Sequence, residues 1–270
     1  MSLQHGVFSD ISFQAYRELP AVSNSYLSRL NHCPAAALIE QEDTPAMAFG
    51  RALHCLALEG RAEFETRYAV APKCDKRTKA GKELFAAFCA DNAGKECINC
   101  DDVEVMHAMA LAILAHPFAK QLLEQGLSEQ TVIWQDEETG LWCKCRPDRI
   151  PTNADGVFID LKTTSNAAER AFQGQVNSLG YFRQAAMYME GLFHATGSVY
   201  KHFAFIAVEK EPPYRVEVYT LDDEYMGFGY DDYHVLLREE KKYRDSGFYP
   251  NYQNAGAIEL YAPQYLRRGV

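Results

Sequence analysis

Apolar residues recur at helical spacing through most of the first half of the chain. The first predicted helix has a serine cap and stops near Cys33-Pro34, and the second stops at Gly60. A proline after His116 predicts a kink in the fourth helix. The four predicted helices cover residues 23–30, 47–59, 79–91 and 103–123.

The second half mixes strands and helices. Residues 131–134, 142–150 and 157–163 predict an antiparallel meander, because a polar turn and a dense turn signal at 151–156 separate them. A helix at 179–192, strands at 199–208 and 214–221 joined across Pro212-Pro213, and a long helix at 223–244 follow. We therefore expect an α/β or α+β fold, with a mixed central sheet flanked by helices.

The chain shows no linker, low-complexity run or repeat that would divide it. With 270 residues and 47% hydrophobic content it can bury a substantial core. We predict one domain over residues 1–270. Its parts are a mainly helical part at 1–125, a core at 126–250 and an irregular tail at 251–270.

Charge and hydropathy narrow the function classes. The formal net charge of −10 argues against a protein that coats nucleic acid non-specifically, but a local basic channel remains compatible with it. No apolar run reaches the length of a membrane span, and the N-terminus lacks the pattern of a signal peptide. We expect a cytoplasmic protein with no membrane partner.

Eight cysteines raise the question of a thiolate metal site. Cys97 and Cys100 could join Cys143 and Cys145 around one ion. The alternative is that Cys143 and Cys145, on one face of a predicted strand, are small apolar residues beneath a sheet, and we favour it.

The turn at 151–156 places two carboxylates together. If the hairpin is symmetric about Ala154, Asp148 lies opposite Asp160, about 5 Å away, where like charges repel. Such a pair invites a divalent cation, and its hard oxygen ligands suit Mg²⁺ or Mn²⁺.

Alternation along residues 157–163 adds a lysine to these carboxylates. Val157, Ile159 and Leu161 should face the core, while Phe158, Asp160 and Lys162 share the other face. An ammonium beside a metal-bound water can orient or deprotonate it and stabilise a phosphorane. The Leu161 carbonyl is a further candidate ligand.

Arg146-Pro147-Asp148 followed by Asp160-Leu161-Lys162 resembles the PD-(D/E)XK nuclease signature. Gly50-x-x-x-His54 resembles the metal-binding histidine motif of its RecB-like branch, and Gln184-x-x-x-Tyr188 resembles that branch's last motif. Glu129 resembles its upstream acidic position. The resemblance implies that His54 binds metal and that Gln184 and Tyr188 contact phosphate or orient Lys162.

The resemblance is closest to the RecE-type phage exonucleases (exonuclease VIII) and covers most of the chain. It implies a Mg²⁺-dependent exonuclease that degrades linear double-stranded DNA from 5′ ends. It also implies a homo-oligomeric ring and a RecT-like single-strand annealing protein as partner. Some RecB-like relatives hold an iron–sulfur cluster with three C-terminal cysteines, but no cysteine follows Cys145, so we expect no cluster.

Each candidate residue also has a purely structural interpretation. Asp148 could cap the turn, and Asp160 could simply pair with Lys162. A histidine on an apolar helix is usually a core residue, Gln184 and Tyr188 could pack on the sheet, and Glu129 could be an ordinary solvated residue. The motifs together favour the functional interpretation, although for Glu129 the two remain balanced.

A basic run lies between residues 73 and 82. It could grip a phosphate backbone, or it could be a solvated loop and helix start. Its members are Lys73, Lys76, Arg77, Lys79 and Lys82.

Three functions compete at this stage. The first is a RecE-like exonuclease, and the second is another nuclease of the same fold, such as an endonuclease or a single-strand enzyme. Degradation of linear but not circular duplex would separate them. The third is a non-catalytic DNA-binding recombination scaffold, which would have no need for two clustered carboxylates beside DNA.

Overall fold

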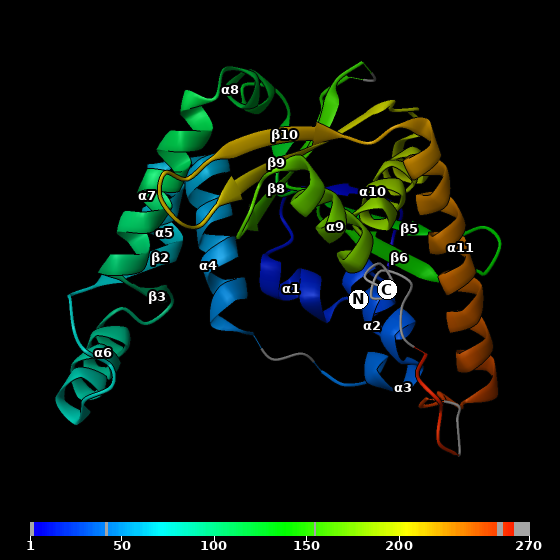
Figure 1. The fold of residues 1–270 in the computed structure, drawn as a ribbon, viewed down its shortest axis with the longest axis horizontal. Coiled ribbons are helices and arrows are strands. Elements are labelled where there is room, and N and C mark those ends of the chain that lie inside the picture. The colour runs from blue at the N-terminus through cyan, green and yellow to red at the C-terminus, as the bar shows by residue number, and fades with distance from the viewer. Residues whose placement is uncertain (1–2, 41–42, 154, 253–255, 262–270) are drawn as a thin grey trace, which may run out of the picture.

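The computed structural model describes residues 3–40, 43–153, 155–252 and 256–261. Helices precede and follow a central group of strands (Figure 1). The helices are α1 (Phe13–Glu18), α2 (Asn24–His32), α3 (Pro34–Ala37), α4 (Pro45–His54), the π-helical η1 (Cys55–Glu59), α5 (Arg61–Arg67), α6 (Lys79–Asp91), α7 (Cys100–Ala115), α8 (Pro117–Leu123), α9 (Glu169–Leu179), α10 (Tyr181–Thr196) and α11 (Asp223–Ser246). The strands are β1 (Gly6–Phe8), β2 (Tyr68–Ala71), β3 (Glu96–Asn99), β4 (Leu127–Ser128), β5 (Thr131–Gln135), β6 (Trp142–Cys145), β7 (Arg149–Ile150), β8 (Val157–Thr164), β9 (His202–Glu209) and β10 (Val216–Thr220).

The strands form three sheets in the described part of the chain. The central sheet has the order β10-β9-β8-β7-β4, in which only β8 and β9 run parallel. A second sheet, β1-β5-β6, is antiparallel throughout. The parallel pair β2-β3 forms the third sheet. The mixed α/β architecture with flanking helices is therefore confirmed.

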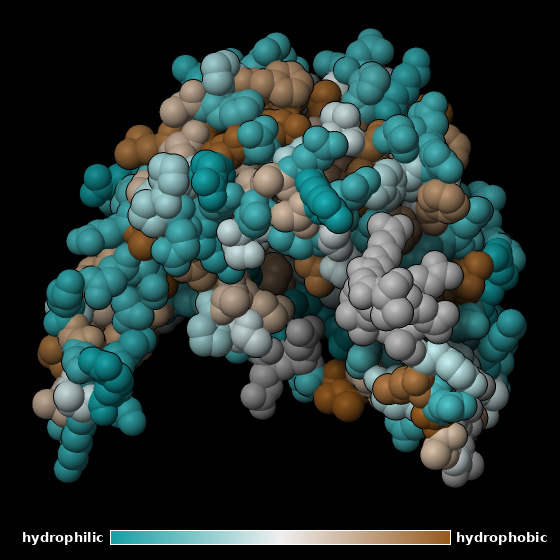
Figure 2. All heavy atoms as spheres, viewed as in Figure 1, coloured by the Kyte–Doolittle hydropathy of each residue, from teal (hydrophilic) through white to brown (hydrophobic). Residues whose placement is uncertain are grey.

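The β2-β3 pair and α6 form an arm that projects from the body. Helix α6 joins the two parallel strands and buries only Gly81 among its residues, so most of its surface faces solvent. In the space-filling view the arm, at the lower left, stands apart from the body across an open concavity (Figure 2). The basic run lies on this arm, at the start of α6 and in the loop before it.

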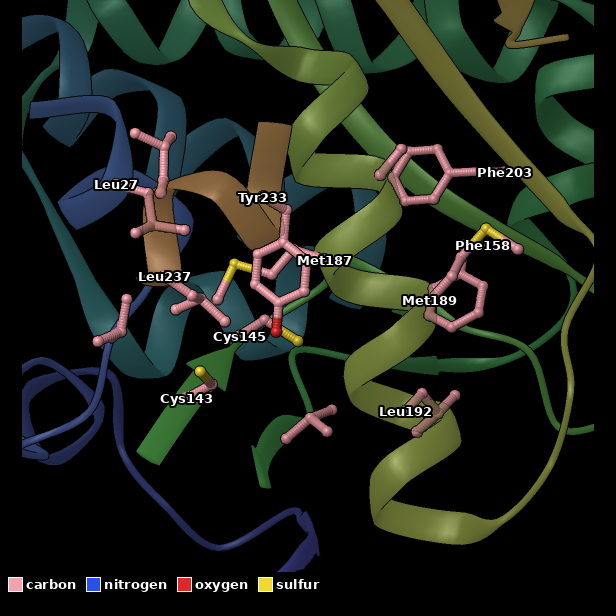
Figure 3. Packing of buried hydrophobic residues seen from close by; sticks show 14 of the residues in the cluster. Leu27, Cys143, Cys145, Phe158, Met187, Met189, Leu192, Phe203, Tyr233 and Leu237 are labelled. Carbon is pink, nitrogen blue, oxygen red and sulfur yellow. The ribbon is translucent and has the colours of Figure 1, made fainter. Parts of the chain in front are cut away.

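Both faces of the central sheet are covered. Ile159 and Leu161 are buried in a cluster with residues of α4 and α7, as the alternation of β8 predicts. Phe158 lies on the opposite face, where α9, α10 and α11 cover it (Figure 3). The predicted polar face of β8 is thus not open to solvent, because a second apolar cluster closes over it.

The predicted meander is wrong in one respect. The expected strand 142–150 is two strands: β6 pairs with β5 in one sheet, and β7 pairs with β8 in another. The break falls at Arg146-Pro147-Asp148, where proline has no N–H for a ladder and the chain crosses between sheets. The two antiparallel pairings themselves agree with the prediction.

The predicted helices agree closely with the structure. Helix α6 has the predicted bounds, and α7 and α8 meet at His116, where the kink was expected. The sequence patterns missed the helices α1, α3, α5 and α9 and the short strands β1, β2, β3 and β4. Residues 253–255 and 262–270 of the predicted irregular tail lie outside the described residues. Within the described ranges, no helix combines the length and apolar character needed to cross a membrane.

Two mid-helix glycines test how tightly this fold packs. A Cβ on Gly191 of α10 would lie 2.5 Å from Cζ3 of Trp134, whereas a Cβ on Gly174 of α9 would meet nothing within 4 Å. We expect Gly191→Ala to lower the free energy of unfolding by about 1–3 kcal/mol, since the fully buried Trp134 ring cannot yield. Gly174→Ala, the matched control, should raise it by about 0.5–1 kcal/mol. Urea unfolding measures both, and a Gly191→Ala protein as stable as the parent would contradict this packing.

Candidate active site

The crossing between β6 and β7 fixes the position of Asp148. Arg149 pairs with Ile159 in the β7-β8 register, which places Asp148 opposite Asp160 as the sequence predicts. The Asp148 Oδ2 atom accepts a hydrogen bond of 2.6 Å from the backbone N–H of Leu161. A buried carboxylate is therefore tied directly to the strand that carries the next two candidate residues.

Three candidate metal ligands converge on this carboxylate. His54 at the end of α4, Glu129 between β4 and β5, and Asp148 place ligand atoms within 4.8 Å of one another. His54 Nδ1 lies 3.0 Å from Asp148 Oδ1. One imidazole and two carboxylates at this spacing can hold a divalent cation.

Burial and mutual charge shift the pKa of each residue in this trio. Burial opposes a charged imidazole, but Asp148 outweighs it and raises the pKa of His54 to about 9. Burial and then the charge of Asp148 raise the pKa of Glu129. For Asp148 burial is outweighed, chiefly by His54, and its pKa is lowered. A metal ion would replace the imidazolium proton as the positive charge that stabilises both carboxylates.

A second group links β8 to α10. Lys162 Nζ lies 2.6 Å from Asp160 Oδ2 and donates a hydrogen bond of 2.8 Å to Gln184 Oε1. The Gln184 amide donates to Asp160 Oδ1 at 2.7 Å and to Tyr188 Oη at 3.0 Å. Gln184 thus joins the carboxylate, the ammonium and the phenol in one hydrogen-bond network, and its role in orienting Lys162 stays a prediction.

The Lys162 ammonium is the partner of one Asp160 oxygen in this second group. It lies 2.6 Å from the buried Oδ2 atom, which accepts no hydrogen bond from any other described residue. Burial raises the pKa of Asp160, Lys162 lowers it, and Asp148 raises it. The net result is a pKa of about 6. Asp160 is therefore a further candidate ligand, at which a metal ion would add to the positive charge of Lys162.

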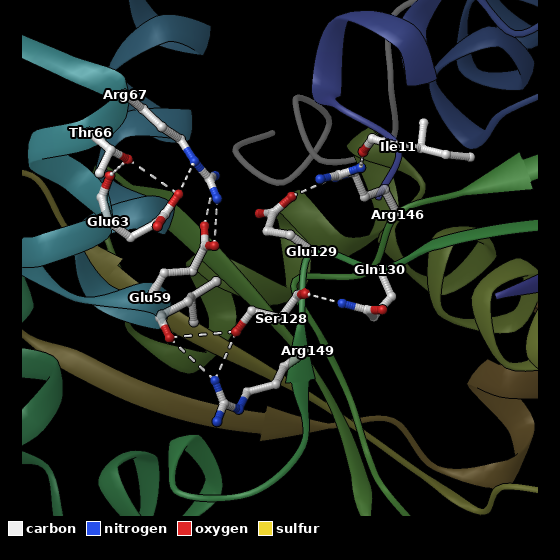
Figure 4. Close-up of polar contacts among 11 residues, drawn as sticks. Ile11, Glu59, Glu63, Thr66, Arg67, Ser128, Glu129, Gln130, Arg146 and Arg149 are labelled. Atoms are coloured by element: carbon white, nitrogen blue, oxygen red, sulfur yellow. Dashed lines mark hydrogen bonds and ion pairs between the residues drawn. The ribbon is translucent and has the colours of Figure 1, made fainter. Parts of the chain in front are cut away.

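The structure also assigns a position to Arg146, a residue to which the sequence gave no role. Its guanidinium donates to Glu129 Oε2 at 2.8 Å and to the Ile11 carbonyl (Figure 4). It also donates to the Thr131 hydroxyl. Glu129 itself has φ +54°, an unusual backbone conformation outside glycine. Such conformations cluster at functional sites because the surroundings must hold them in place.

Tyr181 is a second residue that sequence analysis missed. The Lys162 Nζ atom lies 4.2 Å from the centroid of its ring, a cation–π contact. Tyr181 precedes Gln184 by three residues on α10, so helical spacing from the predicted motif would have found it.

The metal-ligand trio faces a cleft of about 1240 Å³. His54, Glu129, Asp148 and Tyr188 line it, together with residues of α1, α2 and α4. Asp160, Lys162 and Gln184 are not among the lining residues described. The candidate metal ligands therefore face the opening, together with Tyr188 of the lysine network.

Other predicted residues lie elsewhere. No member of the basic run lines the cleft in the described chain. The cysteine pairs do not converge, because Cys143 and Cys145 lie in the core beneath α10 and α11 (Figure 3), whereas Cys97 and Cys100 belong to the arm and the start of α7. The role of the Leu161 carbonyl stays a prediction.

A family model described as "PDDEXK-like domain of unknown function (DUF3799)" matches residues 23–262. The chain belongs to this family. The resemblance to the PD-(D/E)XK superfamily is thereby confirmed, while its RecE-type specificity stays a prediction. No curated protein matches the sequence significantly.

Solved structures agree with the family at the level of the fold. A structure from Eubacterium rectale named "Putative exonuclease" aligns over 100% of both chains, with a TM-score of 0.59 and 14% identity. This likeness shows the PDDEXK-like fold alone. An alkaline exonuclease from Laribacter hongkongensis aligns over 64% of this chain and 87% of its own, with 16% identity and a TM-score of 0.29, too low to carry an argument.

Metal affinity tests the trio directly. Glu129→Gln should weaken Mn²⁺ binding about tenfold or more, because it removes a charged ligand and leaves Arg146 without its carboxylate. Isothermal titration calorimetry measures the affinity, with Glu124→Gln on the exposed end of α8 as the control. Equal Mn²⁺ affinity in both variants would show that Glu129 is not a ligand.

Proposed function

We propose that this protein is a metal-dependent deoxyribonuclease whose active centre comprises Asp148, Asp160 and Lys162. One observation carries the proposal: on a PDDEXK-like fold, these residues lie together with His54 and Glu129, beside a cleft. A DNA-binding scaffold has no use for two buried carboxylates, a partly buried one and a lysine gathered together, since burying charges costs free energy.

The donor set suggests which ion is held. Asp148, Glu129, Asp160 and His54 would bind Mg²⁺ or Mn²⁺, and the imidazole favours Mn²⁺. When bound, the ion lowers the pKa of a water molecule and neutralises charge on the scissile phosphate. A metal-free assay should accordingly show no cleavage.

Lys162 is best suited to a role as a cation. Burial opposes its charge, but Asp160 and its other neighbours outweigh this and raise the pKa of the ammonium. At neutral pH it therefore acts as a hydrogen-bond donor and positive charge that orients water and stabilises the phosphorane, rather than as a base. Gln184 and Tyr181 hold its position.

The resemblance to RecE-type exonucleases supports the finer part of the proposal. The substrate would be linear double-stranded DNA, degraded 5′-to-3′ during phage-type recombination. The protein would act in the cytoplasm as a homo-oligomeric ring, with a RecT-like single-strand annealing protein as its partner.

The arm supplies the basic surface for this substrate. Three of its cations have partners on the arm or on α7: Lys73 pairs with Asp101, Arg77 with Asp75, and Lys79 with Glu83. Lys76 lies over the Phe85 ring, and Lys82 is exposed. We propose that these residues contact the DNA backbone outside the cleft.

Digestion of end-labelled DNA tests the activity. With Mg²⁺ or Mn²⁺ the protein should remove the 5′-labelled strand of linear duplex and leave circular duplex intact. Lys162→Ala should reduce the rate on the order of 10²–10⁴-fold, because the charge at the phosphorane is lost. Lys120→Ala, an exposed lysine on α8, is the control.

The outcomes separate the three functions. Cleavage of circular duplex or single strands would favour another nuclease of this fold over the exonuclease. Absence of any cleavage by folded, metal-loaded protein would rule out the enzyme and leave a DNA-binding scaffold.

The arm has a test of its own. Replacing Lys76, Lys79 and Lys82 with alanine should raise KM about tenfold at physiological salt with little change in kcat, because these residues lie outside the cleft. The slope of log affinity against log salt should fall by about 2–3. Alanine at Lys210, Lys241 and Lys242 is the charge-matched control, because Lys210 follows β9 and the other two lie on α11, outside the arm. If both triple variants behave alike, the arm has no specific role.

A further inference from the structure

A second group of potential metal ligands lies outside the active centre. Asp136 in the turn after β5, Glu190 on α10 and His234 on α11 place ligand atoms within 4.8 Å of one another. None of the three lines the described cleft. Three separate elements therefore bring one imidazole and two carboxylates to a single point.

The two carboxylates lack a permanent cation. Asp136 is 3% exposed, and the Glu190 side chain is 15% exposed. No lysine or arginine of the described chain forms an ion pair with either, and the described partners of Glu190 in ion pairs are His194 and His234. Two partly buried negative charges this close repel unless a positive charge lies between them.

The surroundings hold the three side chains in place. The Asp136 Oδ2 atom accepts hydrogen bonds from the Thr139 N–H at 2.7 Å and from the Thr139 hydroxyl. Tyr233, the neighbour of His234, is fully buried in the core (Figure 3), which fixes the rotation of α11. The site is preorganised, so a bound ion would not have to order it.

Each oxygen of Glu190 faces an imidazole. Oε2 lies 3.1 Å from His234 Nε2, and Oε1 lies 3.4 Å from His194 Nε2. Tetrahedral sites that combine imidazole and carboxylate ligands are typical of Zn²⁺, with an outer imidazole or water completing the arrangement.

We propose that Asp136, Glu190 and His234 bind a divalent transition-metal cation, with Zn²⁺ the best match, and that His194 supports Glu190. The ion would join the β5-β6 turn to α10 and α11. It would brace the helix that also carries Gln184 and Tyr188, at a point that shares no ligand with the active centre.

Equilibrium dialysis against Zn²⁺ at pH 7.5, with the metal counted per chain, tests the proposal. The parent should bind one more Zn²⁺ ion per chain than His234→Ala or Glu190→Gln. The isosteric Glu190→Gln variant keeps the test valid if His234→Ala fails to fold. His194→Ala should weaken this site about tenfold and still fill it at high Zn²⁺. His107→Ala, an exposed histidine on α7, should match the parent.

Thermal unfolding provides the second readout. Zn²⁺ should raise the Tm of the parent and of His54→Ala by about 5 °C, because the ion binds the folded state, and should not do so in His234→Ala or Glu190→Gln. Loss of the shift in His54→Ala alone would assign the ion to the active centre and overturn the proposal. Equal Zn²⁺ counts in the parent, His234→Ala and Glu190→Gln would also overturn it.

Discussion

The buried Asp148 carboxylate connects the central sheet with the helix that carries His54. One oxygen accepts from the Leu161 N–H of β8, and the other meets His54 of α4. Asp148 stands where the chain leaves the β1-β5-β6 sheet and enters the central one. The two sheets, the N-terminal helices and the candidate active centre therefore depend on one buried charge with fixed partners.

The negative charge of Asp148 shifts the pKa values of the titratable side chains around it. Burial raises the pKa values of Glu129 and Asp160, and the charge of Asp148 raises them further. Burial lowers the pKa of His54, but Asp148 outweighs it and raises that pKa. Arg146 offsets part of the negative charge of Glu129, and Lys162 offsets part of that of Asp160. The buried Asp160 Oδ2 atom has the Lys162 ammonium as its partner, and a divalent ion held by His54, Glu129 and Asp148 would add positive charge nearby.

Helix α10 connects the chemistry with the rest of the fold. Gln184 and Tyr188 face the active centre, Gly191 packs on Trp134, and Glu190 reaches the second ligand group. The helix is buried along most of its length, so changes at one of these points are constrained by the others. This packing explains how two polar clusters can be held rigidly on either side of an apolar core.

The sequence by itself determined the mixed fold, the bounds of α6, the alternation along β8 and the register that sets Asp148 against Asp160, because these depend on neighbouring residues. It missed α9 and three short helices, the short strands, and the break at Arg146-Pro147-Asp148. Only the tertiary structure decided that Glu129 joins His54 and Asp148, and that Arg146 and Tyr181 support the site. Residues 54 and 148 are 94 positions apart, and their meeting depends on how helices and sheets pack, which local periodicity does not encode.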